Sequence, residues 1–395
     1  MSVVTRGALV GLVVAGLAGC GGRGEPVEVR DAAAKEPPAA STMRARAVGD
    51  SMLDCDLDVR VSPSETTAAA IGVDGAFITA ALAGGRDATR RLELDGTLRA
   101  PVAVGGDAAK AFALAGDARR LVALRMSDDR AWEAVDLDPK TGAPLDRPVA
   151  HWVKDRGTLC GDRLLVLGDG GDVVREVGRD AALATLPSSR VWPMNAAFDV
   201  VCGDTADLAL SNVVREEGGK ERVTTFGAAL DHGGGARAAK PLFDDGGWTE
   251  RAVARDDDGG YVFFSRPRDG SNWRTQRFDA KADARAAPRD LARDGIFARE
   301  LRAARLPGGG WVVTYWAGDG PHDHAWLQRF DARVELIGGA VPIDSGDDAG
   351  DPFPAEIAVT RGALAIVYTT RPPIRGGPEP AHAGPHLALV RCKRR

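Results

Sequence analysis

The strongest constraint on this chain of 395 residues is an internal repeat. Two segments share one order of features: DDDGGYVFFSRPRDGSNWRTQRFDAKAD, which starts at Asp256, and RLPGGGWVVTYWAGDGPHDHAWLQRFDARVE, which starts at Arg305. Each has paired glycines, a β-rich run, a polar turn and a tryptophan-containing run that ends in Gln-Arg-Phe-Asp-Ala. Phe278 and Phe330 lie 52 residues apart, so the chain contains a duplicated unit.

The β-rich run that opens the unit recurs elsewhere and gives seven copies at intervals of roughly 43 to 54 residues. That interval is the length of a four-stranded propeller blade. Short β-rich runs divided by Gly, Asp and Pro turns, without helical periodicity, predict an all-β chain. We therefore predict a β-propeller of about seven blades, with six or eight as alternatives, because a β-sandwich would not repeat at a fixed interval. The weaker copies are GAFITAAL (75–82), RRLVALRM (119–126), DRLLVLGD (162–169), ADLALSNV (206–213) and GALAIVYT (362–369).

The two ends of the repeat region predict how the ring closes. The last unit contains one strand fewer than the others, and the run CDLDVRVSP (55–63) is the expected missing strand. The N-terminal strand would then complete the last blade. Cys55 and Cys392 would lie on neighbouring strands, whose Cα atoms are about 4.5 to 5.5 Å apart, a separation that a disulfide permits.

Two further cysteines, Cys160 and Cys202, each precede a Gly-Asp pair and a second strand, in adjacent units. Equivalent positions in adjacent blades should face one another, so we predict a second disulfide between them. An oxidising compartment would allow both bonds. Four cysteines permit three pairings, and four free buried thiols are the alternative.

An apolar run at the N-terminus indicates where the protein resides. The run Gly7–Gly19 is 13 residues long, whereas a transmembrane helix needs about 20 residues. Because Arg6 precedes it, the run is typical of a secretory signal peptide. The letters LAGC at 17–20 resemble the lipobox of bacterial lipoproteins. That resemblance implies cleavage before Cys20 and a membrane anchor of lipid on this cysteine. An ordinary cleaved signal is the alternative.

We accordingly divide the chain into a signal peptide (1–19), a lipidated flexible tether (20–53) and a propeller domain (54–395). The tether is rich in Gly, Pro, Ala and alternating charges, a composition that does not support a packed core. Gly21 stands where an aspartate tends to retain such lipoproteins at the inner membrane, so we expect the bacterial cell envelope, with the outer membrane preferred. The 51 basic and 56 acidic residues give no electrostatic reason to bind nucleic acid.

The usual sequence signatures of hydrolases, zinc proteases, nucleotide-binding proteins and thiol oxidoreductases do not occur in the chain. We therefore predict no catalytic residue and no cofactor. The acidic run DDDGG (256–260) has oxygen ligands for calcium, but Asp and Gly are also ordinary turn residues. Equivalent turns of the last two units hold a candidate metal site, because neutral imidazole binds zinc, copper or nickel; solvated histidine-rich loops are the alternative. Its residues are His322, His324, His382 and His386.

The pattern GGGWVVTYW…QRFDA resembles propeller lipoproteins of GC-rich, myxobacteria-like species, and this resemblance implies no activity. The leading expectation is a non-enzymatic binding or scaffolding module that holds a protein or glycan partner at the envelope, beside the membrane contact through Cys20. The alternative is a carbohydrate-active hydrolase or lyase, which needs two carboxylates about 5 to 10 Å apart at a mouth of the central channel. Recurring tryptophans are expected in the core between blades rather than on a sugar-binding face: Trp273, Trp311, Trp316 and Trp326.

Overall fold

The computed structural model describes twenty stretches of the chain. Every described residue belongs to one compact unit, Val48–Arg395. The predicted signal peptide and Cys20 therefore lie outside the described residues. No described segment is a helix with the length and apolarity needed to cross a membrane. The described residues are 52–53, 55–63, 70–73, 75–83, 85–105, 108–117, 119–126, 131–153, 157–167, 173–177, 183–190, 199–218, 220–232, 235–244, 249–267, 273–291, 298–318, 324–344, 351–371 and 384–393.

The described residues form seven antiparallel sheets, each built from strands that pair in order, and we number these sheets as blades along the chain. Blade 1 contains β2 (Ala70–Val73), β3 (Ala76–Ala83), β4 (Arg86–Glu93) and β5 (Val102–Ala103). Blade 2 contains β6 (Ala111–Gly116), β7 (Leu121–Met126), β8 (Ala131–Leu137) and β9 (Ala150–Val153). Blade 3 contains β10 (Thr158–Cys160), β11 (Arg163–Leu167), β12 (Val173–Val177) and β13 (Leu183–Arg190).

Blade 4 contains β14 (Asp199–Val201), β15 (Ala206–Glu217), β16 (Lys220–Asp231) and β17 (Gly235–Ala236), with β18 (Lys240–Asp244) as a further partner of β16. Blade 5 contains β19 (Thr249–Arg255), β20 (Tyr261–Pro267), β21 (Arg274–Phe278) and β22 (Arg289–Asp290). Blade 6 contains β23 (Ala298–Arg305), β24 (Trp311–Ala317), β25 (His324–Phe330) and β26 (Leu336–Pro342). Blade 7 contains β27 (Asp351–Thr360), β28 (Ala363–Arg371), β29 (Gly384–Cys392) and the N-terminal β1 (Leu57–Pro63).

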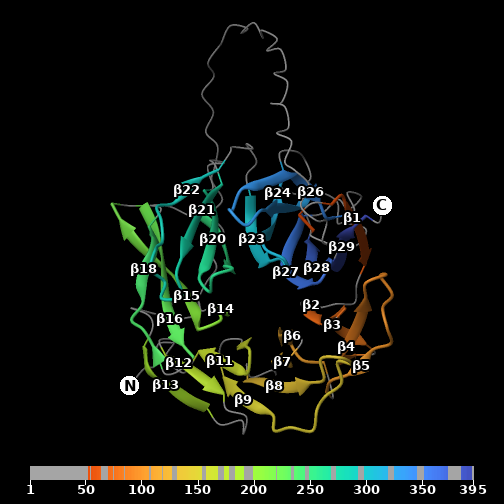
Figure 1. Cartoon of the computed structure of the whole chain (residues 1–395). Helices are drawn as coiled ribbons and strands as arrows, with labels where there is room; N and C mark the ends of the chain where they lie inside the picture. Colours follow the sequence, from red (N-terminus) through yellow and green to blue (C-terminus); the bar gives the residue numbers. More distant parts are fainter. Residues whose placement is uncertain are drawn as a thin grey trace, which may run out of the picture. The chain divides into compact units, whose positions relative to one another are not determined.

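The seven blades form a closed ring, as Figure 1 shows. The first strand of each blade contacts the first strand of the next, from β2 through β6, β10, β14, β19, β23 and β27 and back to β2. First strands therefore surround the centre of the ring, and later strands lie progressively outward. The expected all-β propeller of about seven blades is confirmed.

The N-terminal strand closes the ring. Strand β1 pairs antiparallel with β29 over its full length, with Leu57 opposite Cys392 and Pro63 opposite His386. Blade 7 thus takes three strands from the C-terminal part of the chain and one from the N-terminal part, as the strand count had predicted. The disulfide between Cys55 and Cys392, whose Cα atoms are 5.5 Å apart, joins the same two segments covalently.

Aromatic side chains of the duplicated unit fill the space between blades 5 and 6. Phe264, Trp273, Trp311 and Phe330 are all almost fully buried in one cluster, and their rings pack in tilted or edge-to-face pairs. Trp316 is also buried, and Trp326 packs against the cluster while partly exposed. The recurring tryptophans thus lie in the core, as the sequence had indicated.

The compact domain starts slightly before the predicted boundary at residue 54. Met52 is buried against blades 6 and 7. Arg329 of β25 donates hydrogen bonds to the backbone oxygens of Met52 at 2.9 Å and Cys55 at 2.8 Å. The last residues of the expected tether (20–53) therefore belong to the packed body, whereas residues 20–50 lie outside the described part of the chain.

Candidate functional site

One face of the ring carries the turns between the first and second strands of every blade. Neighbouring strands of a blade run antiparallel, so the turns between third and fourth strands lie on the same side. We call this the turn face. The last residue of a first strand pairs with the first residue of the second strand, for example Arg255 with Tyr261 and Arg305 with Trp311. This register identifies equivalent positions in different blades.

At the turn face, arginines clamp blades 4, 5 and 6 together. Arg255, the last residue of β19, forms an ion pair with Asp204 in the first turn of blade 4. Arg305, the equivalent residue of β23, forms an ion pair with Asp257 in the first turn of blade 5. Burial lowers the pKa of Arg255 from its ordinary value, and the nearby positive charge of Arg305 lowers it further. Each clamp joins one blade to the blade before it.

The acidic run considered for calcium is part of this arrangement. Asp256 lies 3.3 Å from Arg277, Asp257 pairs with Arg305, and Asp258 pairs with Arg285. All three carboxylates are therefore compensated by guanidinium groups. The run acts as a charged turn that holds neighbouring strands and blades, which agrees with the ordinary turn interpretation.

The clamp is replaced by small residues where blades 7 and 1 meet. Thr360 of β27 and Val73 of β2 take the positions of Arg255 and Arg305, since they pair with the first residues of their second strands. Instead of an ion pair, the Thr360 hydroxyl donates a hydrogen bond of 2.9 Å to the Val73 carbonyl oxygen. The neighbouring Gly72 lets the two first strands approach closely. Because no long side chains fill this junction, space remains at the turn face.

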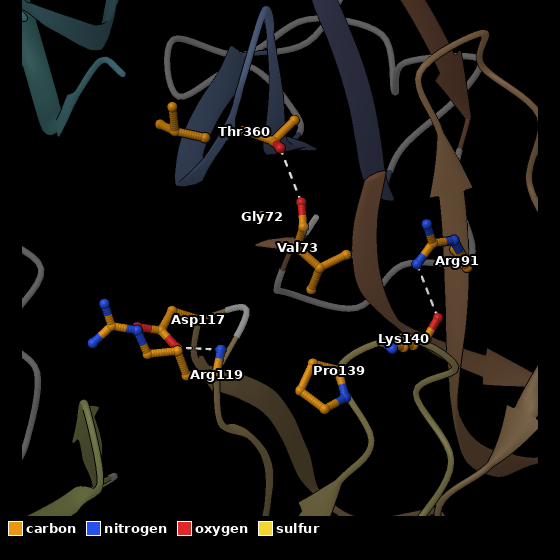
Figure 2. A pocket seen from close by; sticks show the side chains of 9 residues that line it. Gly72, Val73, Arg91, Asp117, Arg119, Pro139, Lys140 and Thr360 are labelled. Atoms are coloured by element: carbon orange, nitrogen blue, oxygen red, sulfur yellow. Dashed lines mark hydrogen bonds between the residues drawn. The ribbon is translucent and has the colours of Figure 1, made fainter. Parts of the chain in front are cut away.

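This space is an open cavity of about 850 Å³ between blades 7, 1 and 2, shown in Figure 2. Such a volume is typical of sites for small ligands. First strands supply its floor, and turns of blade 2 supply its other side. The cavity is lined by Gly72, Val73, Arg91, Asp117, Arg119, Pro139, Lys140, Val359 and Thr360.

Hydrogen bonds hold the polar wall of the cavity in place. Asp117 Oδ1 accepts the backbone N–H of Arg119 at 2.7 Å and that of Arg120 at 3.3 Å, which fixes the turn between β6 and β7. The Arg91 guanidinium donates to the backbone oxygen of Lys140 at 2.9 Å and so holds the turn between β8 and β9 against blade 1 (Figure 2). Arg119 and Lys140 are exposed residues that line the cavity.

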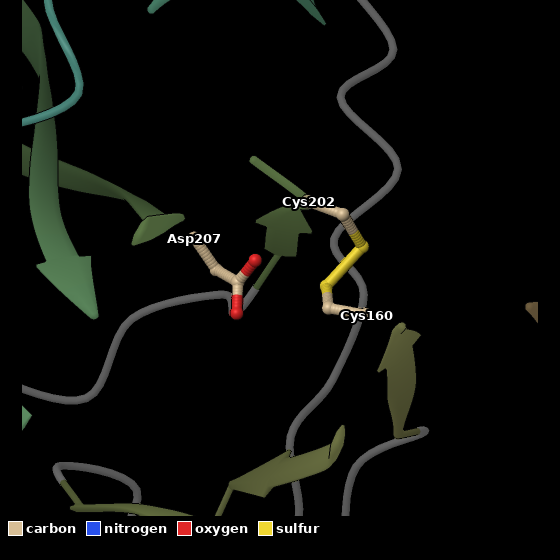
Figure 3. A group of neighbouring side chains, drawn as sticks. All are labelled: Cys160, Cys202 and Asp207. Carbon is tan, nitrogen blue, oxygen red and sulfur yellow. A yellow bond between two sulfur atoms is a disulfide. The ribbon is translucent and has the colours of Figure 1, made fainter. Parts of the chain in front are cut away.

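A second polar cluster joins blades 3 and 4, and Figure 3 shows its central part. Cys160, at the end of β10, forms the predicted disulfide with Cys202, and their Cα atoms are 5.1 Å apart. The carboxylate of the fully buried Asp207 lies beside these sulfur atoms. This is the only group of three potential metal ligands among the described residues. Because both sulfur atoms are bonded to each other, the group serves here as a covalent joint between blades.

Asp207 is the centre of the hydrogen bonds around that joint. Its carboxylate accepts from Arg163 at 3.0 Å and from the backbone N–H of Gly203 at 3.1 Å, and it lies 3.1 Å from His232 Nε2. The nearby Tyr261 hydroxyl donates a 2.6 Å hydrogen bond to the Ala206 carbonyl oxygen. Burial, together with the negative charge of Asp207, raises the pKa of Tyr261 well above its ordinary value, so this phenol remains a donor.

The predicted histidine site is only partly described. His322 and His382 lie outside the described residues. His324 Nδ1 lies 3.2 Å from Asp344 Oδ1, and its ring packs edge-on against Trp326. His386 is 3% exposed, and its ring stacks on Tyr368 at a centroid distance of 5.0 Å. A metal site of these four histidines stays a prediction.

Sequence reasoning did not identify the cavity between blades 7, 1 and 2. Its lining comes from residues as distant in the chain as Val73 and Thr360, and none of them belongs to a catalytic or ligand-binding motif. The repeat does not single out this junction either. The arginine that ends the first strand in blades 5 and 6 is replaced by Val73, Gly116, Cys160 and Thr360 in blades 1, 2, 3 and 7.

The sequence matches no protein-family model and no curated protein. Solved structures with similar backbones include puromycin hydrolase, at 18% identity over 78% of this chain and a TM-score of 0.44. The chain spans only 50% of that structure. The β-propeller domain of the trilobed protease from Pyrococcus furiosus has 11% identity, coverage of 79% and 92% of the two chains, and a TM-score of 0.46. The Dos1 propeller has 13% identity, coverage of 80% of this chain and 75% of its own, and a TM-score of 0.41.

Proposed function

We propose that this protein is an exported, lipid-anchored β-propeller that binds a glycan, without transforming it, in the cavity between blades 7, 1 and 2. The observation that carries the proposal is the cavity itself. It opens at the junction of blades 7 and 1, where Thr360, Val73 and Gly72 stand instead of the arginine clamps of blades 5 and 6. A concave site of this volume suits a sugar unit or a short oligosaccharide.

The two disulfides support export. Cys55–Cys392 and Cys160–Cys202 are both formed, and such bonds persist in oxidising compartments such as the bacterial periplasm. With these four cysteines paired, Cys20 is the remaining cysteine of the chain. Its position after the LAG letters of the lipobox makes it the proposed site of lipid attachment.

The composition of the surface favours a polar ligand over a protein partner. Among the described residues, the large hydrophobic side chains that are exposed are Leu98 and Val149, at 38% and 37%. Stable protein interfaces usually have an apolar, aromatic-rich centre. The cavity, by contrast, is lined by the charged side chains of Arg91, Asp117, Arg119 and Lys140, and such groups hydrogen-bond to sugar hydroxyls.

The carboxylates at the turn face favour binding over hydrolysis. Asp204 and Asp257 are both paired with arginines, and Asp117 Oδ1 accepts two backbone N–H groups. A glycosidase needs one carboxyl group as the acid and a second as the base or nucleophile. Asp117 is the only carboxylate among the nine described residues that line the cavity.

Cell fractionation tests the anchor. We expect the full-length protein, produced in a Gram-negative host, to sediment with membranes and to incorporate an alkyne-labelled fatty acid. The Cys20→Ala variant should lose the label and leave the membrane fraction, because the acyl chains supply the membrane affinity. An unlabelled wild-type protein would instead support an ordinary cleaved signal peptide.

Calorimetric titration with oligosaccharides tests the binding site. We expect detergent-solubilised full-length protein to bind a trisaccharide saturably and to return it uncleaved, as judged by chromatography of the sugar. Pro139→Trp places a large side chain at the cavity rim and should abolish binding. Val149→Trp adds the same side chain at an exposed position outside the cavity and should leave sugar binding unchanged. Shorter sugar products, or sugar binding that Pro139→Trp leaves unchanged, would contradict the proposal. Binding of a protein but of no sugar would show that the ligand is a protein.

A further inference from the structure

Four arginines at the turn face of blades 5 and 6 are compensated by acids of a neighbouring strand or blade. Arg255 and Arg305 pair across blade boundaries, and Arg277 and Arg285 pair with acids of the first turn of blade 5. Compensated charges of this kind stabilise the ring and leave little net field for a ligand.

The cavity departs from this pattern. Arg119 and Lys140 are exposed at its wall, and neither side chain forms an ion pair with any described residue. Asp117, the one carboxylate among the nine lining residues, keeps its negative charge but accepts the backbone N–H groups of Arg119 and Arg120 through Oδ1 and forms no ion pair with either cation. The third cation, Arg91, already lies 3.3 Å from Glu93 Oε1. Arg119, Lys140 and Asp117 together therefore leave a net charge of about +1 at a concave site, and neither cation is neutralised by direct contact with a described carboxylate.

We propose that Arg119 and Lys140 bind an anionic group, a carboxylate or a phosphate, carried by the glycan that occupies the cavity. This inference rests on the proposed function and specifies its ligand as an acidic sugar. A concave site focuses the field of its charges and attracts anions. The planar guanidinium matches a carboxylate or phosphate with two parallel hydrogen bonds, and the ammonium adds a compact charge.

The structure also fixes the backbone that carries both cations. The Asp117 turn carries Arg119, and the hydrogen bond from Arg91 to the Lys140 carbonyl oxygen fixes the backbone that carries Lys140 (Figure 2). Lys140 N–H is bonded to Asp138 Oδ1 at 2.8 Å, which closes the same turn from within. Two hydrogen-bonded turns of blade 2 thus carry the two cations that line the cavity together with residues of blades 7 and 1.

Calorimetry with three probes tests the inference: trigalacturonate, which carries carboxylates; glucose 6-phosphate, which carries a phosphate; and uncharged maltotriose. We expect an acidic probe to bind at least about tenfold more tightly than maltotriose, because hydrogen bonds between charged groups are the stronger ones. The double variant Arg119→Gln, Lys140→Gln should lose that preference. Raising the salt concentration should weaken binding to the wild type and have little effect on the variant.

Blades 5 and 6 offer a matched control. Lys281 and Arg333 lie two residues after the turn aspartate, as Lys140 does, and their N–H groups are bonded to it at 2.8 and 2.9 Å. Lys281→Gln, Arg333→Gln removes the same charge outside the cavity and should keep the preference. Tighter binding of trigalacturonate would indicate that the site recognises a carboxylate, and tighter binding of glucose 6-phosphate would indicate a phosphate. Equal affinity for maltotriose and the acidic probes would overturn the anionic ligand and leave the glycan site standing. Absence of binding by all three would overturn both.

Discussion

At the scale of single residues, Gly72 determines how closely blades 7 and 1 approach. A Cβ atom at this position would lie 1.9 Å from the carbonyl oxygen of Val359, so any other residue must push β2 and β27 apart. We expect Gly72→Ala to lower the free energy of unfolding by about 1 to 3 kcal/mol, as other overpacked sites do. Urea denaturation measures the change. Gly339→Ala is the control, because a Cβ there meets nothing within 4 Å, and an equal loss in both variants would refute the close approach.

Asp207 is the residue on which the joint between blades 3 and 4 depends. It is fully buried and bonded to Arg163, to Gly203 N–H and to His232. Asp207→Asn removes the buried negative charge that pairs with the mostly buried Arg163, and we expect a loss of about 3 kcal/mol in unfolding free energy. Asp231→Asn removes an exposed pair with Arg237 and should cost less than about 1 kcal/mol. Similar losses for the two aspartates would show that Asp207 is not a structural centre.

At the scale of elements, an arginine near the end of the third strand links several blades to the next. Each of these arginines donates a hydrogen bond to a backbone oxygen in the turn or segment that belongs to the following blade. These bonds add to the side-chain packing, the arginine clamps and the Cys160–Cys202 disulfide that also join neighbouring blades. The four donors are Arg91 to Lys140, Arg277 to Ala332, Arg329 to Met52 and Arg391 to Leu94.

The bond from Arg329 predicts how the N-terminal segment is held. Gln at this position is too short to reach the oxygens of Met52 and Cys55, so we expect Arg329→Gln to speed amide hydrogen exchange over residues 52–59 severalfold and to cost about 1 to 3 kcal/mol. Hydrogen exchange followed by mass spectrometry measures the first effect. The control is Arg333→Gln, because Arg333 lies in the following turn and its side chain is exposed. This variant should leave hydrogen exchange over residues 52–59 unchanged. Unchanged exchange in Arg329→Gln would indicate that β1 alone holds the segment.

At the scale of the whole molecule, the two disulfides close loops of very different size. Cys55–Cys392 spans 337 residues and Cys160–Cys202 spans 42. In the chain-entropy model the contribution of a disulfide grows with the logarithm of loop length, and a roughly eightfold longer loop adds about 2 kcal/mol. We expect Cys55→Ser, Cys392→Ser to lower the free energy of unfolding by about that much more than Cys160→Ser, Cys202→Ser. Chemical denaturation of both variants measures the difference, and the opposite order would mean that local packing outweighs ring closure.

Much of the fold followed from the amino-acid sequence because a propeller is a local unit copied many times. The interval between Phe278 and Phe330 indicated the blade length, the recurring β-rich runs indicated the blade number, and the incomplete last unit indicated that residues 55–63 complete it. Both disulfides followed from the same logic, since equivalent positions of adjacent blades face each other and the two ends of the chain meet in one blade.

The candidate site followed from none of this. Val73, Arg119, Lys140 and Thr360 are ordinary residues in their own segments, and they line one cavity only because ring closure brings blade 7 beside blades 1 and 2. The sequence by itself determined the repeating strands, their number and their covalent joints, since hydrophobic pattern and period are properties of short segments. Only the tertiary structure decided where the ring has unfilled space and a local excess of positive charge, because both depend on which side chains of distant segments meet at one place.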